Sequence, residues 1–221
     1  MKVSDKIYIN SGNDNIIRLI KNSSHKILDI GCGAGNNAKL LKELGNTIDG
    51  ITISNDEMKL ASVYCRNIYN FNLENGLPDE VYVNQYNFII CSHVLEHIAF
   101  PERLLNDIYN LASKNKAKIL IALPNIMYFK TRFNLLLGKF EYTNDGIMDY
   151  THLRWYTKKS ATSMFEKYNF VVRSSSVSGL PPLYSLIRKL GKKPTRITNQ
   201  FLFFLAPTLF GSELLFELDC N

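Results

Sequence analysis

Short apolar runs alternate with stretches of helical spacing along the first half of the chain. Helical patterns cover residues 36–44, 56–64 and 101–112, and the first ends before Gly45, a residue type that commonly terminates helices. The apolar runs that predict buried strands cover residues 26–30, 46–53, 66–72, 86–92 and 117–123. Strands that alternate with helices through short links indicate a parallel sheet covered on both faces.

The second half of the chain begins with a different pattern. Residues 125–149 are rich in aromatic residues and leucine and then in turn residues, which predicts an insertion over the carboxyl edge of the sheet. A helix at 158–167 and strands at 169–177 and 212–219 follow. The chain is therefore expected to be an α/β protein with a Rossmann-like, doubly wound, mostly parallel seven-stranded sheet, helices on both faces and an insertion after strand 5.

A basic segment with several prolines, residues 181–196, precedes the apolar run QFLFFLAPTLF at 200–210. Pro207 and Gly211 interrupt this run, which is shorter than the roughly 20 apolar residues that span a bilayer. It favours a buried helix or a homodimer surface, and peripheral membrane association is the alternative. Stable membrane insertion is not expected.

The 221 residues carry a formal net charge of +6, with a pI near 9.0. A basic protein can favour an anionic partner, but the lysines are dispersed, so no nucleic-acid partner is expected. The four cysteines form no C-x-x-C pair and the N-terminus lacks the pattern of a signal peptide. These features predict reduced thiols in a cytoplasmic protein.

The segment HVLEH, His93 to His97, matches the H-x-x-E-H signature of one class of zinc peptidases. That site needs a helix of several turns and a third ligand from another helix. Here an apolar strand runs directly into the motif, and Pro101 opens a new helix soon after, leaving room for about one turn. The sequence therefore predicts no metal site.

The segment ILDIGCGAGN, residues 27–36, places a glycine-rich turn between a strand and a helix. Such a turn lets the backbone approach a ligand closely and aims a helix N-terminus at it. Asp29, two residues before the first glycine, would repel a pyrophosphate and attract an ammonium group. The expected ligand therefore carries a cationic amine next to a nucleoside, as S-adenosylmethionine does.

The motif D-I-G-C-G-A-G resembles the first motif of the class I S-adenosylmethionine-dependent methyltransferases. Residues 86–105 and 123–125 are similar to the fourth-strand and fifth-strand regions of that family, and DYTHLRWYT at 149–157 is similar to enzymes that methylate quinone precursors and surface glycans. The resemblance implies a single methyltransferase domain over residues 1–221. Within it, a helical lid at 1–24, a substrate-side insertion at 125–156 and a basic and apolar insertion at 181–210 are expected.

The resemblance also implies which residues contact the cofactor. Thr52 and Asn72 stand where the family usually has acidic residues for the ribose and adenine, and Asp49 falls on the wrong side of its strand. A similar G-[IL]-T-[IL]-S segment occurs in cyclopropane-fatty-acid synthases. The expected cofactor residues are Asp29, Gly31, Cys32, Gly33, Gly35, Asn36, Thr52, Ile53, Asn72, Leu73, Cys91, Ser92 and His93.

Two histidines are candidates for removing a proton from the acceptor, His152 and His97, because imidazole titrates near neutral pH. For each, a structural hydrogen bond is the alternative. Arg154, Tyr150 and Asn125 are the expected acceptor-binding residues.

The expected activity is methyl transfer to a small polar molecule, with a sugar hydroxyl of a bacterial surface-polysaccharide precursor preferred. A lipid-like quinone precursor and an amine are alternative acceptors. A cofactor-binding protein without catalysis is an alternative from another class, because of Thr52 and Asn72.

Overall fold

The computed structural model describes residues 7–8, 10–20, 23–179, 202 and 204–221. Seven strands form one sheet in the order β3-β2-β1-β4-β5-β7-β6. All neighbouring pairs from β3 to β5 are parallel, whereas β7 runs antiparallel to both β5 and β6. The strands are β1 (Lys26–Ile30), β2 (Thr47–Thr52), β3 (Asn67–Asn70), β4 (Phe88–Ser92), β5 (Lys118–Pro124), β6 (Phe170–Ser178) and β7 (Glu213–Cys220).

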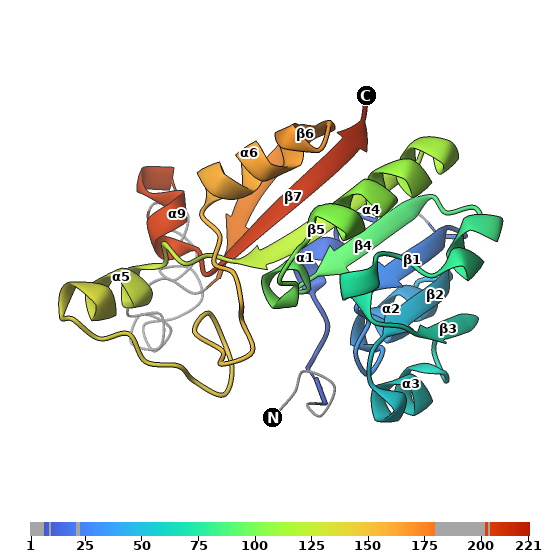
Figure 1. The fold of residues 1–221 in the computed structure, drawn as a ribbon, viewed down its shortest axis with the longest axis horizontal. Helices are drawn as coiled ribbons and strands as arrows, with labels where there is room; N and C mark the ends of the chain where they lie inside the picture. The colour runs from blue at the N-terminus through green and yellow to red at the C-terminus, as the bar shows by residue number, and fades with distance from the viewer. Residues whose placement is uncertain (1–6, 9, 21–22, 180–201, 203) are drawn as a thin grey trace.

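Helices cover both faces of this sheet, as Figure 1 shows. One face packs against α4 and α6 through a cluster that includes Leu104 and Phe165, and the other against α1 and α2 through Ile16 and Leu41. The helices are α1 (Asp14–Ile17), α2 (Asn36–Glu43), α3 (Asn55–Ala61), α4 (Glu102–Asn115), α5 (Phe129–Leu136), α6 (Lys158–Lys167) and α9 (Pro207–Phe210). The described part of the chain also contains the 3₁₀ helices η2 (Leu73–Asn75), η3 (Asp79–Val83) and η4 (Leu95–His97).

The predicted architecture is confirmed, since the sheet is mostly parallel, seven-stranded and covered on both faces. The pattern missed α5, whose side chains are largely exposed, including Leu136 at 82%. A helix with so little buried surface has no clear apolar stripe in its sequence. It belongs to the segment after β5 that extends away from the sheet in Figure 1.

The apolar run before β7 differs from the expectation in its described part. Phe204 and Leu205 are 83% and 60% exposed, so a buried helix is the wrong prediction for these two residues. The basic segment 181–196 lies outside the described residues. No helix among the residues that the structure describes is long and apolar enough to cross a bilayer.

The order of the strands fixes where a ligand can bind. The chain winds outward from β1 through β2 to β3 in one direction, and through β4 to β5 in the other. In sheets of this type the crevice outside the carboxyl ends of the strands, at the point where the order reverses, is the usual binding site. The loops that follow β1, β2 and β4 meet at that point.

Candidate functional site

A cavity of about 660 Å³ opens at the carboxyl ends of β1, β2 and β4. That volume lies within the usual range for small-molecule sites. Ten of the thirteen expected cofactor residues line it: Gly31, Cys32, Gly33, Asn36, Thr52, Ile53, Asn72, Leu73, Ser92 and His93. Asp29, Gly35 and Cys91 do not line the cavity. Asp29 and Cys91 are buried, and Gly35 lies against Ala61 of α3.

The glycine-rich loop after β1 needs glycine at specific positions. Gly31 has φ of +70°, and a Cβ atom there would lie 2.3 Å from Cγ2 of Val94, so no side chain fits. The backbone N–H of Cys32 donates to the carbonyl of Ile51 at 2.8 Å, which ties the loop to β2. This loop brings bare backbone to the cavity wall, as close approach to a ligand requires.

The surroundings of the Asp29 carboxyl group are unusual for a buried acid. Its side chain is 1% exposed, and neither carboxylate oxygen has a hydrogen-bond partner among the described residues. Burial raises the pKa of Asp29 to about 7, against a smaller lowering effect of the Asn37 amide. A buried carboxylate without a partner is costly, which is typical of a group reserved for a ligand.

The structure supplies a carboxylate at the end of β2 that the sequence reading missed. Glu57, in the first turn of α3, is 3% exposed and lines the cavity. Its Oε2 accepts the hydroxyl of Thr52 at 2.7 Å, and its Oε1 accepts the backbone N–H of Tyr8 at 2.8 Å. Glu57 therefore brings a negative charge to the place where Thr52 had replaced the usual acid. The signal in the sequence was an acid in the first turn of the helix that follows the strand.

Asp49, on the preceding part of β2, is turned away from the cavity as expected. Its buried carboxylate accepts from Arg66, from the hydroxyl of Tyr86 at 2.9 Å and from the backbone of Asn67 at 3.2 Å. These partners satisfy it inside the fold. It is a structural carboxylate, in contrast to Asp29 on the neighbouring strand.

Asn72 caps the short helix η2, with its side-chain oxygen accepting the N–H of Glu74 at 3.0 Å. Its side chain is exposed at the rim of the cavity beside Leu73. Glu74 in turn accepts the backbone N–H of Ala99 at 2.6 Å, which joins the rim to the loop after β4. Asn72 thus keeps amide hydrogens that can reach a ligand.

His93 stands at the carboxyl end of β4, with φ of +56°, and forms ion pairs on both sides. Nε2 lies 2.8 Å from Oε1 of Glu213 at the start of β7, and Nδ1 lies 3.3 Å from Oε1 of Glu96. Burial lowers the pKa of His93, but the two carboxylates outweigh this effect and raise the pKa to about 10. The ring is therefore a fixed cation in the cavity wall.

The two candidate catalytic histidines lie together beside Glu96. The rings of His97 and His152 are 4.7 Å apart, and Nε2 of His152 is 4.0 Å from Oε1 of Glu96. His97 lines the cavity, whereas His152, 7% exposed, does not. Burial and, to a lesser degree, His152 lower the pKa of His97, while Glu96 and the carbonyl of Thr151 oppose this. His152 thus needs His97 as an intermediary to reach a ligand.

None of the three residues expected to bind the acceptor lines the cavity. Asn125 is fully buried and donates to the carbonyls of Thr208 and Gly211, so it anchors the chain before β7. The guanidinium of Arg154 donates to the carbonyl of Ala99, at 2.9 Å from Nε, and so fastens the insertion to the loop after β4. Tyr150 is half-buried in the insertion. Asn125, Arg154 and Tyr150 thus lie outside this cavity, and their role in acceptor binding stays a prediction.

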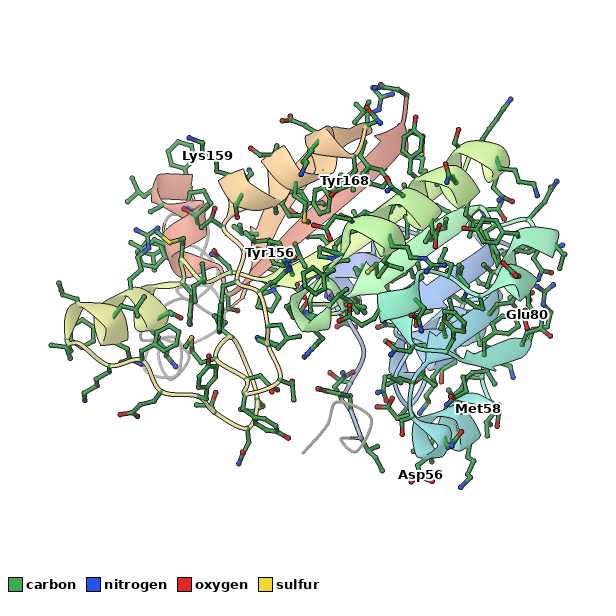
Figure 2. The ribbon with its side chains drawn as sticks, in the orientation of Figure 1. Asp56, Met58, Glu80, Tyr156, Lys159 and Tyr168 are labelled. Carbon is green, nitrogen blue, oxygen red and sulfur yellow. The ribbon has the colours of Figure 1, made fainter. Side chains whose placement is uncertain are left out.

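The insertion is fixed to the sheet at its end. Tyr156, labelled in Figure 2, is buried where the chain returns toward α6, and its hydroxyl donates to the carbonyl of Leu95 at 3.3 Å. The carbonyl of Glu96 accepts the backbone N–H groups of Leu153 at 2.8 Å and Arg154 at 3.1 Å. These bonds hold residues 151–154 against η4, which is how His152 reaches His97.

Comparisons with known proteins agree with this geometry. A family model described as a methyltransferase domain matches residues 8–175. The ubiquinone biosynthesis O-methyltransferases of Psychrobacter arcticus and Escherichia coli are each 25% identical to the chain, over 92 and 91 residues. The matches cover 39% and 36% of this chain, and they span only about a third of the relatives, 36% and 35% of their lengths.

Solved structures extend the likeness over the whole fold. A methyltransferase from Archaeoglobus fulgidus, described as dependent on S-adenosylmethionine, matches with a TM-score of 0.63 at 20% identity, covering 93% of this chain and 91% of that one. Magnesium protoporphyrin IX methyltransferase from Synechocystis, with bound S-adenosylhomocysteine, gives 0.56 at 12% identity, covering 93% and 78%. At such identities the likeness concerns the fold.

Proposed function

The chain belongs to the methyltransferase domain family, and we propose that it transfers a methyl group from S-adenosylmethionine to a hydroxyl of a small-molecule acceptor. The observation that carries the proposal is the cavity beside the glycine-rich loop. Two residues before the first glycine of that loop, Asp29 is a buried carboxyl group with no hydrogen-bond partner among the described residues. S-adenosylmethionine supplies an electrophilic methyl group on a sulfonium sulfur.

The residues of the cavity fit the parts of that cofactor. The carboxylate of Asp29 suits its ammonium group, and the bare backbone at Gly31 and Gly33 suits its methionine part. The carboxylate of Glu57 is the group for the ribose hydroxyls, and the amide hydrogens of Asn72 suit a ring nitrogen of the adenine. Glu57 also weakens the argument for a protein without catalysis, since it restores the acid that Thr52 had replaced.

The acceptor hydroxyl must lose its proton as it attacks the methyl group. We place that step at the cluster of Glu96, His97 and His152, because His97 is the member that lines the cavity. The insertion holds His152 against it and so brings the cluster together. General assistance of this kind contributes roughly 10²–10⁴-fold to a rate.

The first candidate acceptor is a sugar hydroxyl of a surface-polysaccharide precursor, supported by the similarity of residues 149–157 to glycan methyltransferases. A specific observation favours a second candidate, a phenolic hydroxyl on a lipid-like quinone precursor. The curated relatives are named as O-methyltransferases of ubiquinone biosynthesis, and Leu136, Leu137 and Phe140 of the insertion are more than half exposed. An apolar surface of this kind suits a lipid-like molecule.

Calorimetric titration with S-adenosylmethionine and S-adenosylhomocysteine tests the cofactor. We expect saturable binding with one site per chain, and its absence would refute the proposal. Transfer of a radiolabelled methyl group to nucleotide sugars, compared with catechol-type phenols bearing an isoprenoid chain, then separates the two acceptor classes. Labelled sugar supports the first candidate and labelled phenol the second.

A further inference from the structure

We propose that Glu96, His97 and His152 form a binding site for a divalent cation of the zinc type. One ligating atom from each of these residues lies within 4.8 Å of the other two. The residues come from two places in the chain, η4 and the end of the insertion, which the fold brings together. The inference rests on the proposed function and deepens it, because this is the cluster at which we place proton removal from the acceptor.

The hydrogen bonds of the two histidines leave a suitable nitrogen on each ring. Nδ1 of His97 lies 3.1 Å from the carbonyl of Thr151, and Nδ1 of His152 lies 3.0 Å from the carbonyl of Ile147. A carbonyl only accepts hydrogen bonds, so Nδ1 carries the proton in both rings. The lone pair of each neutral ring is then on Nε2. Backbone carbonyls that fix metal-binding histidines in this tautomer are a regular feature of metal sites.

Glu96 provides the third group. Its side chain is 1% exposed, and Oε2 has no hydrogen-bond partner among the residues that the structure describes. Oε1 lies 3.3 Å from Nδ1 of His93, whose other ring nitrogen, Nε2, lies closer to Oε1 of Glu213, at 2.8 Å. Glu96 therefore offers a buried carboxylate oxygen that has no other hydrogen-bond partner in the described part of the chain.

The chemistry of the donors selects the ion. Two imidazole nitrogens and one carboxylate oxygen suit Zn²⁺ and similar transition metals, whereas Mg²⁺ and Ca²⁺ prefer oxygen ligands. Bonds of about 2.0–2.2 Å would place the donors about 3.3 Å apart, so the side chains must close by roughly 1 Å. Three protein ligands leave a position open, as in catalytic zinc sites. His97 directs that position toward the cavity, where an oxygen of the acceptor can enter.

The His93–His97 segment therefore contributes to a metal site in a different way from zinc peptidases. His93 is held between two carboxylates and is not a ligand. The third ligand, His152, lies 55 positions further along the chain. The sequence-based prediction that no metal binds here considered only partners on a second helix, and the insertion provides the partner instead.

Cobalt titration of the full chain, stripped with a chelator, tests the proposal. We expect one Co²⁺ per chain, with visible d–d absorption and X-ray absorption that shows nitrogen and oxygen neighbours only. His152→Ala should weaken binding by more than about 100-fold, since even residues that merely orient a metal ligand contribute roughly 10–100-fold. His25→Ala, at a histidine that packs on Phe88, is the matched control and should leave binding unchanged.

Three results would overturn the proposal: no bound cobalt, a thiolate-to-cobalt band that assigns the ion to cysteines, or unchanged binding in His152→Ala. Without cobalt binding, the cluster acts as a metal-free base. Should His152→Ala fail to fold, the X-ray absorption of the wild-type chain still decides. Binding of S-adenosylmethionine, measured on the same sample, keeps the two proposals separate. A chain that binds cofactor but not cobalt refutes the metal site alone, and the reverse refutes the proposed function.

Discussion

Replacing Asp29 by Asn should make the cofactor-free protein more stable, although most substitutions in a core destabilise. The carboxyl is buried, neither of its oxygens has a hydrogen-bond partner within the described part of the chain, and its pKa is raised from 3.8 to about 7. The folded chain therefore retains a proton that the unfolded chain releases near pH 3.8. The free energy of unfolding falls as the pH rises from 3.8 to 7 and then stays at its lower level, about 4 kcal/mol below its value in acid. Asn carries no charge and escapes this loss.

The magnitude can be measured as a difference between two pH values. The raised pKa of Asp29 lowers the free energy of unfolding by about 1 kcal/mol at pH 4.5 and by about 4 kcal/mol at pH 8, relative to its value in acid. The stability that Asp29→Asn gains over the wild-type chain should therefore be about 3 kcal/mol larger at pH 8 than at pH 4.5. For a chain of this size that corresponds to a gain in melting temperature of roughly 6–12 °C at pH 8 relative to pH 4.5. Thermal unfolding followed by circular dichroism, without cofactor, gives the two values for each chain.

Asp49→Asn provides the matched control on the neighbouring strand. Its carboxylate has the same burial but is satisfied by Arg66, Tyr86 and Asn67. Removing the charge there should destabilise the protein by about 1–3 kcal/mol, because the buried acceptor of these hydrogen bonds loses its charge while Arg66 stays partly solvated. If Asp29→Asn raises the free energy of unfolding and Asp49→Asn lowers it, Asp29 is the carboxylate that serves a ligand and Asp49 the one that serves the fold. The reasoning is refuted if the gain in the free energy of unfolding from Asp29→Asn is no larger at pH 8 than at pH 4.5.

Three further predictions concern the cavity. Asp29→Asn should lower the affinity for S-adenosylmethionine by roughly 100-fold at pH 8, as measured by calorimetry. The affinity of the wild-type chain should fall about tenfold per pH unit below pH 7, and an affinity that does not change with pH would contradict an ion pair between Asp29 and the cofactor. Gly31→Ala should abolish cofactor binding through the contact with Val94, whereas Gly138→Ala, at a similar φ of +71° but with nothing within 4 Å, should cost only about 1 kcal/mol in thermal unfolding. Glu57→Gln should weaken cofactor binding about tenfold, whereas Asp56→Asn, an exposed neighbour labelled on α3 in Figure 2, should not.

The parts of the fold that the sequence predicts are those where a local pattern and the tertiary structure require the same thing. β1, β4 and β5 are buried on both faces, so their apolar runs have no polar interruption except at Asp29. The glycines of residues 31–35 require conformations and close approaches that other residues cannot adopt. α5 was missed because it buries almost nothing, and its sequence carries no record of a packing face.

The acceptor-binding residues were harder to predict, because type and spacing cannot show where a side chain finds its partner. Asn125 and Arg154 have the chemistry of ligand-binding residues, but each is occupied by backbone carbonyls that belong to distant segments. Glu57 looked like one more acid in the first turn of a helix, where such residues are favoured by the helix dipole. Only the fold shows that its carboxylate turns inward to Thr52.

The cluster beside the cavity illustrates the same point for chemistry. His97 and His152 are each unremarkable alone, and a histidine bonded to a backbone carbonyl is more often structural than catalytic. The fold makes them candidates because it brings them together. The backbone N–H groups of residues 153 and 154 donate to the carbonyl of Glu96, and this fixes the insertion where the two rings lie beside the Glu96 side chain. The backbone carbonyl of Glu96 thus helps to place His152 beside His97, and the Glu96 side chain is the third member of the cluster. A local motif cannot encode that arrangement, since half of it depends on the path of a loop some 55 residues away.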